Sequence, residues 1–238
     1  MPASSPPADR KTRAARRKQA THDRLVAAAF KLIAERGVDG VAINEITEAA
    51  DVGFGSFYNH FPSKDAIYSK VFEIVVEEFG AVLDSLTAKT EDPAEVVAVC
   101  VRHTILRAQA EPLWGRFLLR ESLTPHGLTK GLGARLLRDI QVGLDQGRFR
   151  ATAAMTLMMM AGGTIMACLA VQAGQQTGVS VPAELKVDVK QLAERTAEAV
   201  LWSLGVPEAE AAALVRKPLP RLAKVSRSLL SGPAEQSS

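Results

Sequence analysis

The stretch that decides the fold reads INEITEAADVGFGSFYNHFPSKDAIY and covers residues 43–68. It holds two short apolar stripes at helical spacing, over residues 43–50 and 54–60, and a tight turn over residues 51–53 separates them. Two helices of this length joined by such a turn have the dimensions of a helix-turn-helix. A further apolar stripe over residues 25–37 ends on a glycine, as helices often do, and completes a head of three helices.

Aromatic residues are concentrated in this stretch, which holds three of the eight Phe and both Tyr of the chain. We expect Phe57 and Phe61, four residues apart, to face inward, because a helix of under two turns has few positions with which to anchor itself and large side chains bury the most area. The outward side then carries an apolar tip and a set of hydrogen-bonding groups suited to phosphates and base edges: Phe54, Ser56, Tyr58, Asn59 and His60.

The rest of the chain also predicts helices. Apolar residues recur at spacings of three and four in successive segments, and Gly or Pro separates most of them. No alternation typical of strands joined by hairpin turns is found, so the expected fold class is all-α. The expected helices after the head cover residues 63–89, 92–111, 113–123, 132–147, 151–173 and 184–204.

The motif ERG at residues 35–37, followed by the stretch over residues 43–68, resembles the DNA-binding head of the TetR family of transcriptional regulators. The resemblance is specific over residues 21–70 and only architectural beyond them, where GRF at 147–149 and RTAEAVLWSLGVP at 195–207 are similar to late segments of the family. It implies a three-helix DNA-binding head and a larger α-helical domain for ligand binding and dimerisation.

The resemblance also implies which residues contact DNA. The pattern FYxHF-x-SK places Tyr58 and His60 at the phosphate backbone and Lys64 at the backbone from the start of the fourth helix, while Phe54, Gly55 and Ser56 approach the bases. The full predicted set is Asn44, Gly53, Phe54, Gly55, Ser56, Tyr58, Asn59, His60 and Lys64.

Three residues depart from the family pattern. Asp51 stands where a Gly is frequent, and Asp tolerates a left-handed backbone better than most residues, so we expect the turn to persist. Ala42 lacks the hydroxyl that usually caps the second helix or bonds a phosphate. Phe54 replaces a polar or basic residue, and it either meets a thymine methyl group or tucks inward.

Charge divides the chain further. The chain carries a net charge of +3, yet residues 10–18 alone contain six Lys and Arg. We expect residues 1–20 to form a flexible basic arm drawn to a polyanion, either DNA phosphates or anionic lipid. The remaining expected divisions are a DNA-binding domain over 21–66, a ligand-binding and dimerisation domain over 67–216 and a mobile tail over 217–238.

Residues 151–173 contain no charged side chain, which is the usual flag for a membrane span. Few of them are strongly apolar, so partition into lipid would be marginal, and a buried soluble helix or a subunit interface is favoured. The family implies a homodimer through this helix and the helix over 184–204. The alternative is a basic membrane-surface protein that uses the arm and this helix.

The resemblance implies a small-molecule effector, and the apolar helices of the larger domain favour a hydrophobic or amphipathic one. Polar or adaptable groups on those helices are the candidate contacts: His103, Arg107, Trp114, Phe117, Met158 and Met159. The scattered His and Cys residues and the absence of known catalytic motifs predict no enzyme, no metal and no cofactor. The expected partners are an operator in double-stranded DNA, a second copy of the chain and the effector, with no membrane and a cytoplasmic location.

Overall fold

The computed structural model describes residues 7–122, 124–178, 182 and 188–222, with side chains from residue 13 onward. Every regular element in these ranges is helical, which confirms the all-α fold class. The chain divides into two compact units between Phe72 and Glu73, a few residues after the boundary expected from the sequence. Each unit is described by itself.

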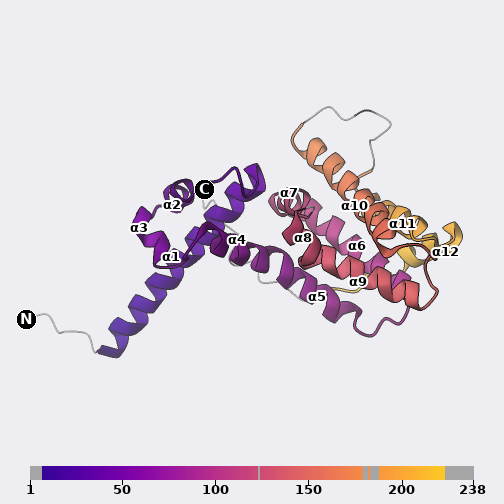
Figure 1. Ribbon diagram of the computed structural model, residues 1–238, viewed down its shortest axis with the longest axis horizontal. Helices are drawn as coiled ribbons and strands as arrows, with labels where there is room; N and C mark the ends of the chain where they lie inside the picture. The colour runs from indigo at the N-terminus through magenta and orange to yellow at the C-terminus, as the bar shows by residue number, and fades with distance from the viewer. Residues whose placement is uncertain (1–6, 123, 179–181, 183–187, 223–238) are drawn as a thin grey trace, which may run out of the picture. The chain divides into compact units, whose positions relative to one another are not determined.

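The first unit is a head of short helices around one long helix (Figure 1). Its core is built from one apolar face of the long helix and the inward aromatics, and Phe57 and Phe61 are buried as predicted. Tyr68 and Phe72 continue this core. The helices are α1 (Pro7–Arg36), α2 (Ile43–Ala49), α3 (Phe54–Tyr58) and α4 (Lys64–Phe72).

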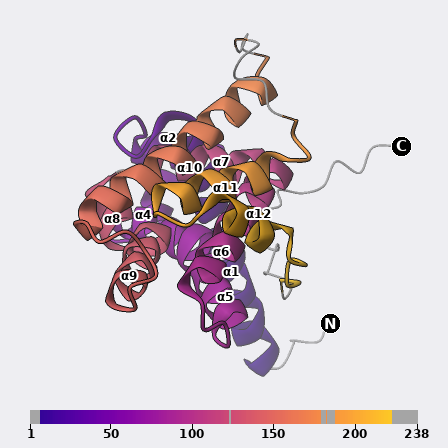
Figure 2. The same cartoon turned by 90° about the vertical axis from the view of Figure 1, so that its right-hand side faces the viewer.

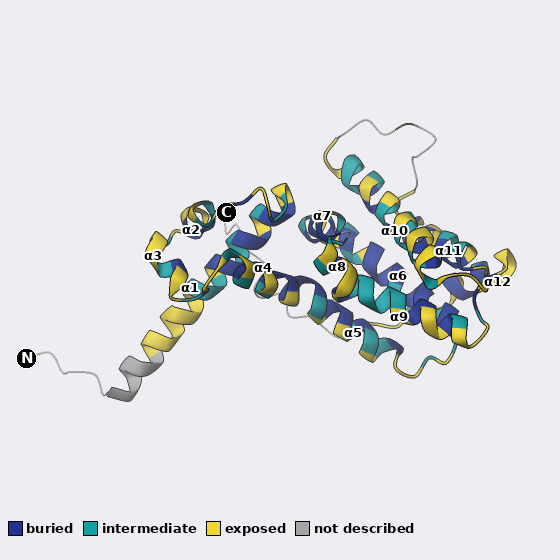
Figure 3. Cartoon of the chain, viewed as in Figure 1, coloured by how far each residue is buried: buried dark blue, intermediate teal, exposed yellow. Residues whose placement is uncertain are grey.

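The N-terminal arm differs from the flexible segment expected over residues 1–20, because α1 already begins at Pro7. Ala, Arg, Lys and Gln dominate this part and are strong helix formers, and the packed part of α1 supplies the nucleus that an isolated helix lacks. Residues 13–20 are exposed on all sides (Figure 3). The first six residues lie outside the described ranges.

The turn between α2 and α3 persists despite the missing glycine. Asp51 adopts a left-handed backbone with φ of 51°, as expected for this residue type, and the amide of Val52 donates to the carbonyl of Thr47 at 3.0 Å. Arg24 of α1 donates to the carbonyl of Asp51 at 3.4 Å. The turn is therefore tied to both helices that flank it in space.

The second unit packs its helices around α6, most of whose residues are buried (Figure 3). In Figures 1 and 2, α11 runs beside α10, and both α10 and α11 contact α6. The helices are η1 (Glu73–Glu77), which is π-helical, α5 (Glu78–Thr87), α6 (Pro93–Ala110), α7 (Pro112–Glu121), α8 (Pro125–Thr129), α9 (Gly131–Asp145), α10 (Ala154–Gln176), α11 (Leu192–Ser203) and α12 (Glu208–Arg216).

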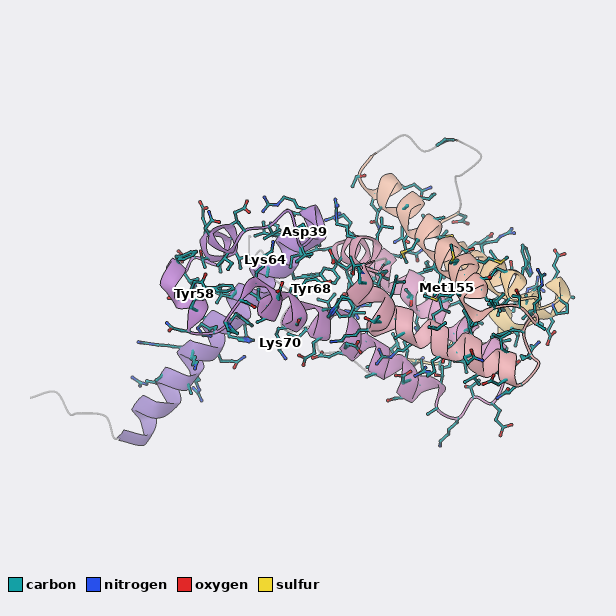
Figure 4. All side chains as sticks on the ribbon, viewed as in Figure 1. Asp39, Tyr58, Lys64, Tyr68, Lys70 and Met155 are labelled. Carbon is teal, nitrogen blue, oxygen red and sulfur yellow. The ribbon has the colours of Figure 1, made fainter. Side chains whose placement is uncertain are left out.

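The uncharged segment forms α10, which is buried along one stripe rather than all round. Met155 is 61% exposed and Met159 is 71% exposed, and Figure 4 shows Met155 as a side chain on this helix. By length and composition α10 is the one helix among the described residues that could cross a membrane, and only 22% of its most apolar window is buried. The core helix of a soluble protein passes the same test.

Two expected features fall partly outside the described residues. The helix expected over 184–204 is described only from residue 188, and its regular part begins at Leu192. Of the tail expected over 217–238, only residues 217–222 are described. They lie against α6, because Arg102 donates to the carbonyl of Lys217 at 2.9 Å.

Candidate nucleic-acid interface and effector cavity

The outward face of α3 presents the candidate nucleic-acid interface. Phe54 is 53% exposed and Tyr58 is 52% exposed, and their rings meet edge to face with centroids 5.7 Å apart. Figure 4 shows Tyr58 on this helix. Phe57 beneath them is fully buried and packs against Tyr58, so the exposed pair stands on a rigid base. Phe54 therefore points outward rather than inward.

The remaining predicted DNA contacts are accessible to different degrees. Asn44, Gly53, Gly55 and Asn59 are exposed, whereas Ser56, His60 and Lys64 are half-buried. All nine predicted residues lie on α2, α3, the first residue of α4 or the loops beside α3. Their contacts with DNA stay predictions, and the head brings them together within one unit.

His60 lies in the loop after α3, close to His22 of α1. Its ring centroid lies 6.1 Å from that of His22, whose ring packs on Phe61 at 4.9 Å. Burial, followed by the charges of His22 and Lys18, lowers the pKa of His60 below its ordinary value. A neutral imidazole still donates one hydrogen bond, which is sufficient for a phosphate oxygen.

The helices that flank α3 begin with different caps. Ala42 provides no side-chain cap for α2, as expected, but the carboxylate of Glu45 accepts from the Ala42 amide at 2.8 Å and pairs with Arg36 at 2.7 Å. At α4, the hydroxyl of Ser63 accepts from the Ala66 amide at 3.1 Å. Both helices are thus anchored without using the predicted DNA-contact residues.

The second unit contains a cavity of about 90 Å³, and α5 to α10 all contribute to its wall. These include the helices that the sequence predicts around an effector. The wall is mostly apolar, and its charged residues come from α5 and α9. The lining residues are Leu83, Asp84, Val97, Cys100, Val101, Thr104, Leu118, Ser122, Leu128, Leu132, Gly133, Arg135, Leu136, Arg138, Asp139, Met158, Gly162, Ile165 and Met166.

Four charged residues form the polar corner of this cavity, namely Asp84, Arg135, Arg138 and Asp139. Asp84 accepts from Arg135 and from Arg138, each at 2.8 Å, and Arg138 also pairs with Asp139 at 2.7 Å. Asp139 is only 9% exposed, so its negative charge depends on this pairing. The corner offers both donors and acceptors to a bound molecule.

The two carboxyl groups of the corner differ in acidity. Burial raises the pKa of Asp139 above its ordinary value, and this effect outweighs the hydrogen bond from Arg138. Burial acts in the same direction on Asp84, but hydrogen bonds from Arg138 and Arg135 outweigh it and lower the pKa of Asp84. Asp84 therefore stays ionised to lower pH, and Asp139 takes up a proton more readily.

Of the six predicted ligand contacts, Met158 lines this cavity and the other five do not. His103 bonds the carbonyl of Pro220 at 3.0 Å, and the guanidinium of Arg107 lies over the rings of Phe79 and Trp114, which also contact each other. Trp114 donates to a backbone carbonyl of η1, Phe117 is fully buried, and Met159 is exposed on α10. The five residues are packed or exposed elsewhere in the same unit.

The sequence prediction missed the whole polar corner. Arg135 and Asp139 are four residues apart beside the apolar positions Leu136 and Ile140, and Asp139 is buried, whereas Arg138 is exposed at the edge of this face of α9. Charged residues within an apolar stripe that faces the core are the sequence signal that could have predicted this polar corner. Asp84 gives the same signal within the apolar face of α5.

Two family models match the chain. The model described as bacterial regulatory proteins of the tetR family matches residues 25–71, and that of the tetracyclin repressor-like C-terminal domain matches residues 92–217, more than half of the chain. Neither match includes the first part of α1.

Curated relatives match over part of their length. The HTH-type transcriptional repressor DhaR of Mycobacterium sp. strain GP1 is 37% identical over 92 residues, which is 39% of this chain and 44% of DhaR. The regulator AcrR of Shigella flexneri is 29% identical over 88 residues, covering 37% of this chain and 41% of AcrR. The match thus spans less than half of either relative.

A solved structure extends the similarity over most of the chain. The crystal structure of RolR in complex with the ligand resorcinol is 34% identical, with a TM-score of 0.61, and the alignment covers 88% of this chain and 100% of that chain. Both units therefore have a counterpart in one relative.

Proposed function

This chain belongs to the TetR family of transcriptional regulators, and we propose that it is a homodimeric repressor whose operator is released when a small amphipathic molecule enters the cavity. The observation that carries the proposal is the exposed polar and aromatic face of α3, held on a buried Phe57. The family consists of transcriptional regulators rather than enzymes. Since such proteins act on DNA, the proposed location is the cytoplasm.

In the proposed complex, α3 enters the major groove. Phe54, Gly55 and Ser56 meet base edges, whereas Tyr58, His60 and Lys64 contact phosphates. The exposure of Phe54 supports an apolar contact, such as a thymine methyl group. The other proposed contacts are Asn44, Gly53 and Asn59, all exposed on the head.

The basic part of α1 adds affinity that depends on salt. Arg16 and Arg17 are exposed there, and a helix fixes their spacing. Attraction to DNA phosphates releases counterions, so deletion of residues 1–20 should make the dependence of log affinity on log salt less steep. An unchanged slope would exclude the arm from the DNA contact.

A second copy of the chain is the proposed cover for the exposed face of α10. Met155, Met159 and Trp202, on α10 and α11, are exposed apolar side chains that a partner helix pair would bury. A dimer presents two α3 helices about 34 Å apart, so the operator should be a near-palindrome. Family membership does not favour the membrane-surface alternative, which predicts sedimentation with anionic vesicles.

The proposed effector is a small ring that carries hydroxyl groups. The cavity of about 90 Å³ has room for about six to nine water-sized groups. Its polar corner can accept from a hydroxyl at Asp84 and donate to it from Arg135. RolR binds resorcinol, which has this size and chemistry, and this similarity supports a phenolic effector here.

The test is fluorescence anisotropy of the purified protein on DNA flanking its own gene, compared with a random duplex of equal length over a range of salt. We expect a specific, salt-sensitive transition at two subunits per site, reversed by a phenolic compound. If specific and random DNA bind equally weakly, a selection from randomised duplexes decides whether another operator exists. Failure of that selection would refute DNA-binding regulation.

A further inference from the structure

We propose that Glu77 is the positioning residue that couples the polar corner of the cavity to the helical segment leading into the DNA-binding head. The inference rests on the proposed function, because it assumes that a ligand in the cavity acts on DNA binding. It concerns a residue outside the cavity wall. Glu77 instead lines an open hollow on the surface, together with Asp84, Arg135 and Arg138 from the polar corner.

Glu77 holds the start of α9. One carboxylate oxygen accepts from the amide of Gly131, the first residue of α9, and the other accepts from Arg135 at 2.8 Å. Lys130 supplies no side-chain cap to α9, and the first turn of α9 has no acidic residue. Glu77 therefore provides both the acceptor and the negative charge that the beginning of a helix requires.

Arg135 is shared between Glu77 and the cavity. Its Nη1 donates to Glu77, while its Nε donates to Asp84 at 2.8 Å. Gly80 makes this possible, because a Cβ atom there would lie 2.5 Å from the guanidinium carbon. Glu77, Gly80 and Asp84 follow at intervals of three and four, so one helix face is arranged around a single arginine.

The segment that ends at Glu77 is the π-helix Glu73–Glu77, which follows directly after α4. Its carbonyl at Val75 accepts from Nε1 of the buried Trp114 at 2.7 Å. A π-helical turn is rare and is often found at functional positions. Here two side-chain bonds fix it, one from Trp114 and one through Glu77 to Arg135.

A ligand in the polar corner would bond Arg135, the same residue that donates to Glu77. Hydroxyl groups that bond Asp84 or Arg135 change how the guanidinium divides its hydrogen bonds, and Glu77 is the partner that lies outside the cavity. Burial by itself raises the pKa of Glu77, but the bonds from Arg135 and the Gly131 amide outweigh it and lower the pKa, so Glu77 responds as a charge. Occupancy of the cavity thereby alters the restraint on the π-helix.

The test compares Glu77→Gln with the matched control Glu91→Gln, whose side chain is exposed in the loop before α6. Resorcinol is the probe and a duplex selected by the wild-type protein is the DNA. Calorimetry gives the affinity for resorcinol, and anisotropy gives the affinity for DNA with and without it. The coupling factor is the ratio of these two DNA affinities, typically about 5 to 150 in allosteric proteins.

We expect Glu77→Gln to keep both separate affinities within about threefold and to lower the coupling factor towards one, while the control matches the wild type. If Glu77 had only a structural role, Glu77→Gln would weaken the affinity for resorcinol and the affinity for DNA but leave the coupling factor unchanged. That result would overturn the proposal. Gly80→Ala displaces Arg135 while Glu77 is retained, and it should also lower the coupling factor. This second variant serves if Glu77→Gln does not fold.

A measurement without resorcinol tests the same coupling in the opposite direction, from bound DNA to α9. Hydrogen exchange of the amides of residues 131–135 should change in the wild type when DNA binds, and Glu77→Gln should abolish the change. No change in the wild type overturns the proposal. If the wild type does not bind any selected DNA, the proposed function is refuted instead. If the wild type binds DNA and resorcinol does not release it, only the proposal of a phenolic effector is refuted.

Discussion

Replacement of Lys64 by Gln isolates one proposed phosphate contact. Lys64 is the first residue of α4, and the hydroxyl of Ser63 caps this helix by accepting from the Ala66 amide. A positive charge at the N-terminus of a helix opposes the helix dipole, so its removal should not weaken the fold. A change in DNA affinity can therefore be assigned to the contact with DNA.

The magnitude follows from counterion release. Each phosphate contact contributes about 0.9 to the slope of log affinity against log salt, so two Lys64 residues in a dimer contribute about 1.8. Between about 50 and about 200 mM salt the wild type should lose about tenfold more affinity than the Lys64→Gln variant. If the slope falls by only about 0.9 in the variant, one Lys64 contact is made per bound dimer rather than two.

The assay is anisotropy on the selected duplex at five or more salt concentrations, with circular dichroism to confirm that the variant is folded. The control is Lys89→Gln, an exposed residue after α5 in the other unit. Equal slopes for the wild type, the variant and the control would refute the assignment of Lys64 to the phosphate backbone.

Three further outcomes are expected. Asp51→Gly should raise stability and Asp51→Val should lower it by about 1–2 kcal/mol in thermal or urea unfolding, because φ is positive there; equal stabilities would contradict this. Burial raises the pKa of Cys100 to about 12. In a Cys168→Ser variant, the Cys100 thiol should therefore react with Ellman's reagent at pH 8 about a thousandfold more slowly than a free thiol does. Rapid reaction would show that Cys100 forms an accessible thiolate and would contradict this prediction. Burial by itself raises the pKa of Asp92, but hydrogen bonds from Arg148 and the Ala94 amide outweigh it and lower the pKa. The contribution of Asp92 to stability is therefore present above its ordinary pKa and is lost as the pH falls through its folded-state pKa. Arg148→Gln should cost stability at pH 7 and little at pH 2, and an equal cost at both pH values would refute the pairing.

The head could be predicted from the sequence because its elements are set by interactions close in the chain. The spacing of Phe57 and Phe61 fixed which side of α3 is buried, and the short turn at Asp51 allowed only a compact arrangement of α2 and α3. Residues 13–20 are helical and were predicted to be flexible, because the prediction rests on their charge, whereas their Ala, Arg, Lys and Gln content favours a helix.

The cavity could be predicted only in outline. An apolar stripe shows that a helix face is inward, but it does not show what that face meets. Asp84 and Arg135 are 51 residues apart, and only the packing of α5 on α9 makes them partners. The predicted contacts His103 and Arg107 had equally inward positions, and tertiary packing gave them other partners.

The sequence by itself thus determined the all-α class, the helix-turn-helix and the family, because periodicity, turn chemistry and a contiguous motif are local properties. It did not predict α8, α12 or the first part of α1 as helical. Only the tertiary structure decided where the charged corner lies, which side chain caps α9 and that η1 is π-helical. These features depend on hydrogen bonds between residues distant in the chain. Their geometry exists only after the helices have packed.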